Sequence, residues 1–308
     1  MKFDLSVEIA GIKMQNPVMN AAGTLDLEPV GVRELCQTDR FGAFVQKSIT
    51  LEPREGNPQP RIYEVVGGLI NRIGLQNVGV GKFVREKLPI IHMLKPVNVP
   101  LIVSVAGERI RDYLDTAIIL QAKSEGRIAA LEINVSCPNV ENGLVFGSDA
   151  NLLWELIMTL KTKISLPLIV KLTPNVENIS LMAEAAVSAG ADAISLINTI
   201  KKKALIERGP NAGQWIEGGL SGPCIKPTAL KKIKEVMEKV EVPVIGMGGI
   251  CDTEDALDFF RLGVSAVAVG TAGFRDPAAI VKIIDGLGDY LKEKGYFSLV
   301  ELKTKEAR

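Results

Sequence analysis

The sequence has few of the residues that several common active sites require. It contains one histidine, His92, and four cysteines, Cys36, Cys137, Cys224 and Cys251. A Ser-His-Asp hydrolase or a histidine-rich zinc site would have to be built on His92, which lies among apolar residues in LPIIHMLKP and is interpreted as structural. Because no two cysteines have CxxC spacing, neither a zinc ribbon nor an iron–sulfur cluster is expected in this chain, and no metal site is predicted.

Net charge and long apolar runs are also missing. The 36 Lys and Arg residues balance 36 Asp and Glu residues, and this neutrality does not favour nucleic acid or an anionic membrane as a partner. Gly, Pro or charged residues interrupt the apolar runs before they reach membrane-spanning length, so no membrane span is expected. Widely spaced cysteines without a recognisable signal peptide favour a reducing cytosol, and a cytoplasmic protein is expected.

What the sequence does contain is a regular succession of short apolar runs typical of buried β-strands. The runs are PVMNAA (17–22), AFVQKS (43–48), PLIVSVAG (100–107), AALEINVS (129–136), PLIVKLTP (167–174), AISLINT (193–199), VPVIGMGG (242–249) and AVAVGTA (266–272). Such strands are buried on both faces, as in a parallel sheet covered by helices. The pattern predicts an α/β fold, a (β/α)8 TIM barrel, and the 308 residues fit one domain over 1–308.

Helical patterns between the runs are clearest late in the chain. Residues 178–190 have apolar side chains at helical spacing, and Gly190 ends the pattern. A second helix is predicted over 253–263, with Thr253 as its N-cap and Gly263 at its end.

Three segments lie outside the alternation of strands and helices. LSVEIAGIKMQNP (5–17) alternates in polarity and turns at Ala10-Gly11, which predicts an N-terminal β-hairpin closing the bottom of the barrel. Segments 49–82 and 200–222 are predicted to be long βα loops over the C-terminal face, where barrel enzymes bind their ligands. Lys201–Lys203 are interpreted as a solvated loop tip, with a partner-docking face as the alternative.

Polar residues follow several predicted strands where they end. These are Lys47-Ser48, Asn134, Lys171 and Asn198-Thr199. A solvated surface charge is the ordinary interpretation of a lysine, but Lys171 lies inside the apolar string PLIVKLTP. A lysine buried in a parallel strand needs an anionic partner or a lowered pKa, so a functional role is predicted for it.

Glycines end the last two predicted strands, at Gly248-Gly249 and Gly270-Thr271. A backbone without Cβ can approach a ligand closely, and free N–H groups beside a helix start bind phosphate. The two pairs therefore favour a phosphorylated ligand, although glycines in tight βα turns can also be purely structural.

Cys137 differs from the other three cysteines. Cys36, Cys224 and Cys251 are interpreted as small buried apolar residues. Cys137 follows a strand end in NVSCPN, where a thiol can act as nucleophile or general base once its environment favours the thiolate.

Together these residues resemble class 1 dihydroorotate dehydrogenases over essentially the whole chain. The matching strings are NRIGLQN (71–77), NVSCPNV (134–140), VKLTPNV (170–176), INT (197–199), GGLSGPCIKP (218–227), GMGGI (246–250) and GTAGFRDP (270–277). The strings GGLSGP, IKP and GMGGI resemble the catalytic subunits of the type 1B branch more than the fumarate-using 1A branch. The base position is Cys rather than Ser, and no membrane-targeting extension precedes the barrel, which is unlike class 2.

The resemblance implies FMN at the barrel mouth and dihydroorotate stacked on it. The implied flavin-binding residues are Ala22, Lys47, Ser48, Ser104, Asn134, Lys171, Ile197, Gly222, Gly248, Gly249, Gly270 and Thr271. The implied substrate-binding residues are Lys47, Asn71, Ile73, Gly74, Leu75, Asn134, Asn139, Asn198 and Thr199. The implied catalytic residues are Cys137, the base that removes the C5 proton, and Lys171, beside the N1/O2 edge of the flavin.

The resemblance also implies a partner that this chain needs. The chain has no Rossmann GxGxxG between a strand and a helix and no four-cysteine cluster set. A separate subunit with FAD and a [2Fe-2S] cluster is therefore implied, passing electrons to NAD+ in a heterotetramer of two plus two.

Three positions and one loop depart from the family pattern: Ala22, Arg72, Ser104 and the basic loop IKKKALIERGPNAGQW (200–215), which contains Trp215. Arg72 lies inside the substrate-binding string, where it points outward or alters which carboxylated substrate is accepted. Three alternatives stay open: an FMN enzyme acting on another dihydropyrimidine such as dihydrouracil, a fumarate-using 1A-like enzyme, and a non-catalytic phosphate-binding barrel.

Overall fold

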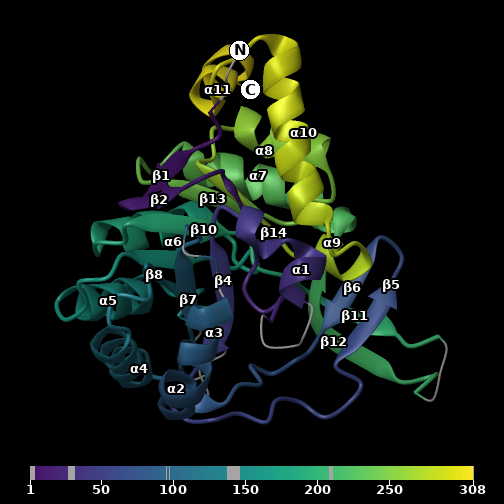
Figure 1. Ribbon diagram of the computed structural model, residues 1–308. Coiled ribbons are helices and arrows are strands. Elements are labelled where there is room, and N and C mark those ends of the chain that lie inside the picture. Colours follow the sequence, from purple (N-terminus) through teal and green to yellow (C-terminus); the bar gives the residue numbers. More distant parts are fainter. Residues whose placement is uncertain are drawn as a thin grey trace.

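The structure is a computed structural model that describes residues 4–26, 32–94, 96, 98–136, 146–207 and 211–307. Eight parallel strands form one sheet in the order β3-β14-β13-β10-β9-β8-β7-β4. A parallel bridge between Met19 and Ala43 joins the two outer strands, β3 (Val18–Asn20) and β4 (Phe44–Ile49), and so closes the sheet into a barrel (Figure 1). The predicted TIM-barrel architecture is confirmed.

Each of the eight predicted runs supplies one barrel strand, although β4 extends one residue beyond its run, to Ile49. The other six are β7 (Leu101–Val105), β8 (Ala130–Asn134), β9 (Leu168–Lys171), β10 (Ala193–Leu196), β13 (Val244–Met247) and β14 (Ala266–Val269). Apart from β4, which is as long as its run, the strands are shorter than the runs, because the terminal residues of those runs form the turns that carry polar groups and glycines.

Helices follow the barrel strands and cover the outside of the sheet (Figure 1). They are α1 (Val32–Cys36), α2 (Gly79–Lys82), α3 (Leu88–Leu94), α4 (Ile110–Lys123), α5 (Ala150–Lys161), α6 (Ile179–Ser188), α7 (Lys226–Met237), α8 (Thr253–Arg261), α9 (Ala272–Arg275), α10 (Ala279–Lys294) and α11 (Leu299–Glu306), with short helical turns at Thr38–Arg40, Phe83–Lys87 and Pro223–Ile225. In the described part of the chain, none of the helices has both the length and the apolar character that crossing a membrane requires.

The N-cap predicted for α8 is wrong by one residue. Asp252 is the cap, and its carboxylate accepts a hydrogen bond from the backbone N–H of Asp255 at 2.9 Å. Thr253 is instead the first residue of the helix. Asp and Thr are both good caps, and composition alone does not decide between two adjacent candidates.

Side chains along each strand point alternately outward and inward, so the apolar residues divide between two cores. One core lies between the sheet and the helices, and the other fills the barrel interior. On β8, Leu131 and Ile133 pack outward against the helices, whereas Ala130 belongs to a cluster that fills the barrel interior. Because successive side chains point to opposite faces, a continuous apolar run serves both cores at once.

The N-terminal hairpin closes the lower end of this interior, as predicted. Strands β1 (Val7–Ile9) and β2 (Ile12–Met14) pair antiparallel across a turn at Ala10 (φ 52°) and Gly11 (φ 78°). Ile9, Ile12 and Met14 pack into the same cluster as the lowest interior residues of the barrel strands.

The two segments predicted as long loops contain regular structure that the sequence pattern did not indicate. Strands β5 (Ile62–Val65) and β6 (Gly68–Asn71) from the first segment join β11 (Ile200–Leu205) and β12 (Trp215–Ser221) from the second in a four-stranded antiparallel sheet, ordered β11-β12-β6-β5. The sheet lies at the opposite end of the molecule from the two termini (Figure 1). Lys201–Lys203 are therefore exposed residues of a strand rather than a loop tip, and Lys201 forms an ion pair of 3.0 Å with Glu217.

Candidate functional site

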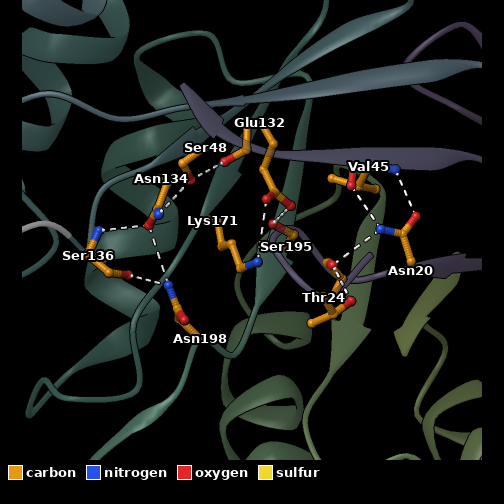
Figure 2. A network of polar contacts seen from close by, with 12 residues as sticks. Asn20, Thr24, Val45, Ser48, Glu132, Asn134, Ser136, Lys171, Ser195 and Asn198 are labelled. Carbon is orange, nitrogen blue, oxygen red and sulfur yellow. Dashed lines mark hydrogen bonds and ion pairs between the residues drawn. The ribbon is translucent and has the colours of Figure 1, made fainter. Parts of the chain in front are cut away.

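The barrel interior becomes charged toward the C-terminal ends of β8, β9 and β10. Lys171 on β9 is 5% exposed, and its Nζ lies 3.4 Å from Oε1 of Glu132 on β8, which is 4% exposed. The Ser195 hydroxyl on β10 donates to the other carboxylate oxygen, Oε2, at 3.1 Å (Figure 2). The structure thus supplies the anionic partner that a buried lysine needs.

Sheet register explains this meeting. Lys171 lies opposite Ser195 on one neighbouring strand and opposite Asn134 on the other. Glu132 is two residues before Asn134, so all four side chains point into the barrel from adjacent strands at two successive levels. In the described residues, the ammonium of Lys171 has no acceptor other than Glu132, which leaves two of its three N–H bonds for a ligand.

A second group of polar side chains surrounds Asn134. Its amide nitrogen donates to the Ser48 hydroxyl at 3.2 Å, and Ser48 in turn shares a hydrogen bond of 2.8 Å with Ser104. Its amide oxygen accepts from the Ser136 N–H at 3.3 Å and from the Asn198 amide at 3.4 Å (Figure 2). Both ends of the Asn134 amide are therefore committed, which fixes its orientation.

An irregularity in β4 brings Ser48 into this group. The register between β4 and β7 shifts between Gln46 and Ile49, which places an extra residue on β4 at its C-terminal end. Such a bulge re-aims side chains next to a binding site. Lys47, beside Ser48, is half-buried, and its side-chain ammonium has no hydrogen bond or ion pair to any described residue.

The two glycines after β13 form a turn that only glycine fits. Gly248 has φ 121°, and a Cβ there would lie 2.9 Å from the Cβ of Ala229; Gly249 has φ 83°, and a Cβ would lie 2.7 Å from the Cβ of Lys226. The backbone N–H groups of Gly248, Gly249 and Thr271 donate to no acceptor in the described chain. Free N–H groups in such turns are suited to bind a phosphate.

Two contacts hold these turns in place. The Thr271 hydroxyl is 2.7 Å from that of Ser221, which ties the end of β14 to β12 next to Gly222. Lys226, against Gly249, forms ion pairs of 2.5 Å with Asp255 and 2.8 Å with Asp258. Burial lowers the pKa of Lys226, but its hydrogen bonds to the two aspartates outweigh burial and raise the pKa overall. Lys226 therefore braces α7 against α8 beneath the turn.

The remaining flavin-site candidates lie at strand ends of the same mouth. Ala22 follows β3 and is half-buried, Ile197 follows β10 and is 2% exposed, and Ser104 on β7 is fully buried. Gly222 is buried at φ 108°, where a Cβ would lie 2.7 Å from the Cα of Gly68. Gly270 has more space, since a Cβ would meet Ala21 only at 3.6 Å.

The substrate string 71–77 lies against the added sheet and the end of β4. Asn71 ends β6, and its amide donates to the backbone oxygen of Gly219 on β12 at 3.2 Å. Thr199 also packs against Gly219. Asn77 joins the string to β4, because its amide nitrogen donates to the Leu75 carbonyl at 2.7 Å and to the Thr50 hydroxyl at 2.8 Å.

Several predicted residues are not brought into direct contact with the charged group. Ile73 accepts a backbone hydrogen bond from Asn57 at 2.9 Å, so the loop 73–75 is anchored to the 54–57 segment. Gly74 and Leu75 have positive φ there, at 75° and 55°. Cys137 and Asn139 lie outside the described residues, so their positions remain predictions from the sequence.

The interpretation of three cysteines as buried apolar residues is only partly right. Cys36 is buried, and burial raises the pKa of its thiol. Cys251 is half-buried, and its pKa is raised first by burial and then by Asp255 and Asp252. Cys224 is exposed, which contradicts the expectation, because it lies on the short helical turn after β12 rather than in a core.

Glu132 and Ser195 are the residues that sequence reasoning missed. Glu132 stands inside AALEINVS as Lys171 stands inside PLIVKLTP, and the argument made for a lysine in an apolar strand applies equally to it. Two opposite charges inside neighbouring buried strands are the signal that could have paired them.

Comparison with known proteins finds extensive similarity. The family model described as "Dihydroorotate dehydrogenase" matches residues 4–291. The chain is 47% identical over 304 residues to the "Dihydroorotate dehydrogenase B (NAD(+)), catalytic subunit" of Geotalea uraniireducens, covering 98% of this chain and 97% of that protein. The protein with the same description from Caldicellulosiruptor saccharolyticus is 44% identical over 301 residues, covering 97% of this chain and 98% of that one.

Proposed function

The chain belongs to the dihydroorotate dehydrogenase family, and from that premise we propose that it oxidises dihydroorotate to orotate in pyrimidine biosynthesis, with NAD+ as the final acceptor. The observation that carries the proposal is the buried Lys171 ammonium, paired with Glu132 but with two N–H bonds uncommitted, at the barrel end that also bears the glycine turns. The proposal takes residues 1–308 as one flavin-binding domain.

The described residues fit FMN. The unpaired N–H groups of Gly248, Gly249 and Thr271 suit its phosphate, and Lys171 supplies a buried cation for the edge of the ring that becomes negative on reduction. FMN, when bound, supplies the acceptor for the hydride from C6 of dihydroorotate. The proposed flavin-binding set is Ala22, Lys47, Ser48, Ser104, Asn134, Lys171, Ile197, Gly222, Gly248, Gly249, Gly270 and Thr271.

Amide side chains and a free cation suit the substrate. Amides read the donors and acceptors of the pyrimidine ring, and the unpaired, half-buried Lys47 suits its carboxylate. Cys137 takes the C5 proton as general base. The proposed substrate set is Lys47, Asn71, Ile73, Gly74, Leu75, Asn134, Asn139, Asn198 and Thr199.

Electrons have to leave through another chain. The relatives are described as catalytic subunits of an NAD(+) enzyme, which names one subunit of an assembly. No Rossmann fingerprint occurs in this sequence. The proposed partner carries FAD and a [2Fe-2S] cluster, in an assembly of two of each subunit in the cytoplasm.

A visible spectrum, recorded before and after anaerobic dihydroorotate, tests flavin content and substrate together. The expected result is a flavin spectrum that bleaches with dihydroorotate and is unchanged by dihydrouracil, which has no carboxylate for Lys47. If dihydrouracil bleaches the flavin and dihydroorotate does not, the substrate is another dihydropyrimidine. No flavin after purification with excess FMN would favour a non-catalytic barrel, and reoxidation by fumarate without a partner would favour a 1A-like enzyme.

A further inference from the structure

Glu132 is a buried carboxylate to which the proposed function gives no role. It is 4% exposed on β8, inside the barrel, where an unpaired charge is strongly disfavoured. Its Oε1 faces the Lys171 ammonium at 3.4 Å, and its Oε2 accepts the Ser195 hydroxyl at 3.1 Å (Figure 2). Both oxygens are thus held, one by each neighbouring interior side chain.

We propose that Glu132 is a positioning residue that keeps the Lys171 side chain charged and fixed in the barrel, so that a full positive charge faces the flavin before it is reduced. The inference rests on the proposed function, since it concerns the same site. Ser195 takes part by holding the carboxylate from β10, because a carboxylate free to rotate would hold the ammonium less firmly.

The physical argument is the cost of burying a lone ammonium. Lys171 is 5% exposed, and Glu132 is its one acceptor among the described residues. Without that carboxylate, the neutral amine becomes the favoured form while the flavin is oxidised and uncharged. Reduction adds negative charge at the ring, which favours the ammonium again, so a proton would then be taken up together with the electrons.

The other charged and polar groups at this end of the barrel do not account for a difference in proton uptake between the wild type and a Glu132 variant. Lys47 on β4 and, in the proposed site, the Cys137 thiol also titrate or carry charge there, and Lys226 beneath the Gly249 turn is paired with Asp255 and Asp258; all of these groups are the same in wild type and in every variant of the test. Ser104 on β7 and Ser195 on β10 carry no charge. A change in proton uptake on replacing Glu132 therefore reports on Lys171.

The test is the midpoint potential of the bound FMN, measured against pH between about pH 7 and pH 9, above the range where free carboxylates titrate. With Lys171 charged throughout, reduction takes up one proton with two electrons, and the potential falls by about 30 mV per pH unit. In Glu132→Gln, uptake of a second proton by Lys171 is expected to double the slope to about 60 mV per pH unit.

Two further variants separate charge from shape. Glu132→Asp keeps the carboxylate and is expected to keep the original slope, although the side chain is one methylene shorter. In the double variant Glu132→Gln with Lys171→Met, the titrating amine is gone and the slope is expected to return to the original value. A merely structural Glu132 would alter FMN content in the Asp and Gln variants alike and leave both slopes unchanged.

An unchanged slope in Glu132→Gln with bound FMN overturns the inference, whatever happens to the potential itself. Should that variant fail to fold, NMR of the Lys171 side-chain amine in the wild-type protein, assigned by its loss in Lys171→Met, is the second measurement. A charged ammonium across the same pH range supports the inference, and deprotonation within it overturns it. The experiment uses no dihydroorotate, so a wild-type protein that binds FMN but is not reduced by dihydroorotate contradicts the proposed function alone.

Discussion

The lower and upper halves of the barrel interior are built by the same strands but have opposite chemistry. Near the N-terminal hairpin the interior is apolar, with Ile102, Ile169 and Ile245 packed against Ile9 and Met14. Two residues further along β7 and β9, the next interior positions are polar: Ser104 follows Ile102, and Lys171 follows Ile169. One step of the strand period thus separates a core from a site.

This difference shows how the fold keeps a charged site stable. The lower layer buries apolar surface and closes the barrel, so the upper layer can hold the Lys171–Glu132 ion pair without being the main source of stability. Substitutions in the upper layer should change ligand binding and catalysis more than stability. Substitutions in the lower layer should change stability more than ligand binding and catalysis.

The largest effect is expected for Cys137→Ala, which removes the proposed general base. Loss of a general base typically costs about 10²–10⁴-fold in rate, so the variant should keep its flavin spectrum and unfolding temperature while turnover with dihydroorotate falls by that factor. Anaerobic stopped-flow bleaching of the flavin measures it. Cys224→Ala, which removes an exposed thiol, is the matched control and should leave the rate unchanged. Bleaching at the wild-type rate in Cys137→Ala would show that Cys137 is not the general base.

The second effect is expected below the site, for Ile169→Ala. Ile169 is 1% exposed and sits one interior position beneath Lys171. Removing its buried methyl groups should lower the free energy of unfolding by about 2–5 kcal/mol, and Ile169→Val should lower it by about 0.5–1.5 kcal/mol. Chemical denaturation measures both. The slowing of flavin reduction in Ile169→Ala can be expressed as an activation free energy. The division between the layers fails if that energy exceeds the loss in the free energy of unfolding.

Much of this division could be predicted from sequence. The eight apolar runs fix the strands, because buried parallel strands need apolar residues on both faces, and Lys171 stands out within one of them. Glu132 was not paired with it, because strand register, which sets which residues are neighbours, is a tertiary property. The same limit hid the added sheet: Lys201–Lys203 read as a solvated loop, since one strand of a half-exposed sheet carries little apolar signal by itself.

The third prediction concerns the glycine turn above β13. In Gly249→Ala, a Cβ would stand 2.7 Å from the Cβ of Lys226 at φ 83°, and a left-handed backbone alone costs about 1–2 kcal/mol for a residue with Cβ. Affinity for FMN should therefore fall by about tenfold or more, as measured by fluorescence titration. Gly295→Ala has a similar φ of 70° with nothing within 4 Å, so it separates backbone strain from loss of the phosphate site. Equal losses of FMN affinity in the two variants would exclude a specific role for Gly249.

The smallest effect is expected for Asp252→Ala. This variant tests whether a residue at the C-terminal end of the barrel can contribute to stability without contributing to ligand binding. Asp252 follows β13 at the same end as Gly249, but its carboxylate caps α8 through the Asp255 N–H at 2.9 Å. Loss of a cap should lower the free energy of unfolding by about 1 kcal/mol and leave FMN affinity unchanged. Thr253→Ala, at the neighbouring position that is not the cap, should cost less. A fall in FMN affinity in Asp252→Ala would mean that the whole C-terminal end, rather than its interior face alone, determines ligand binding.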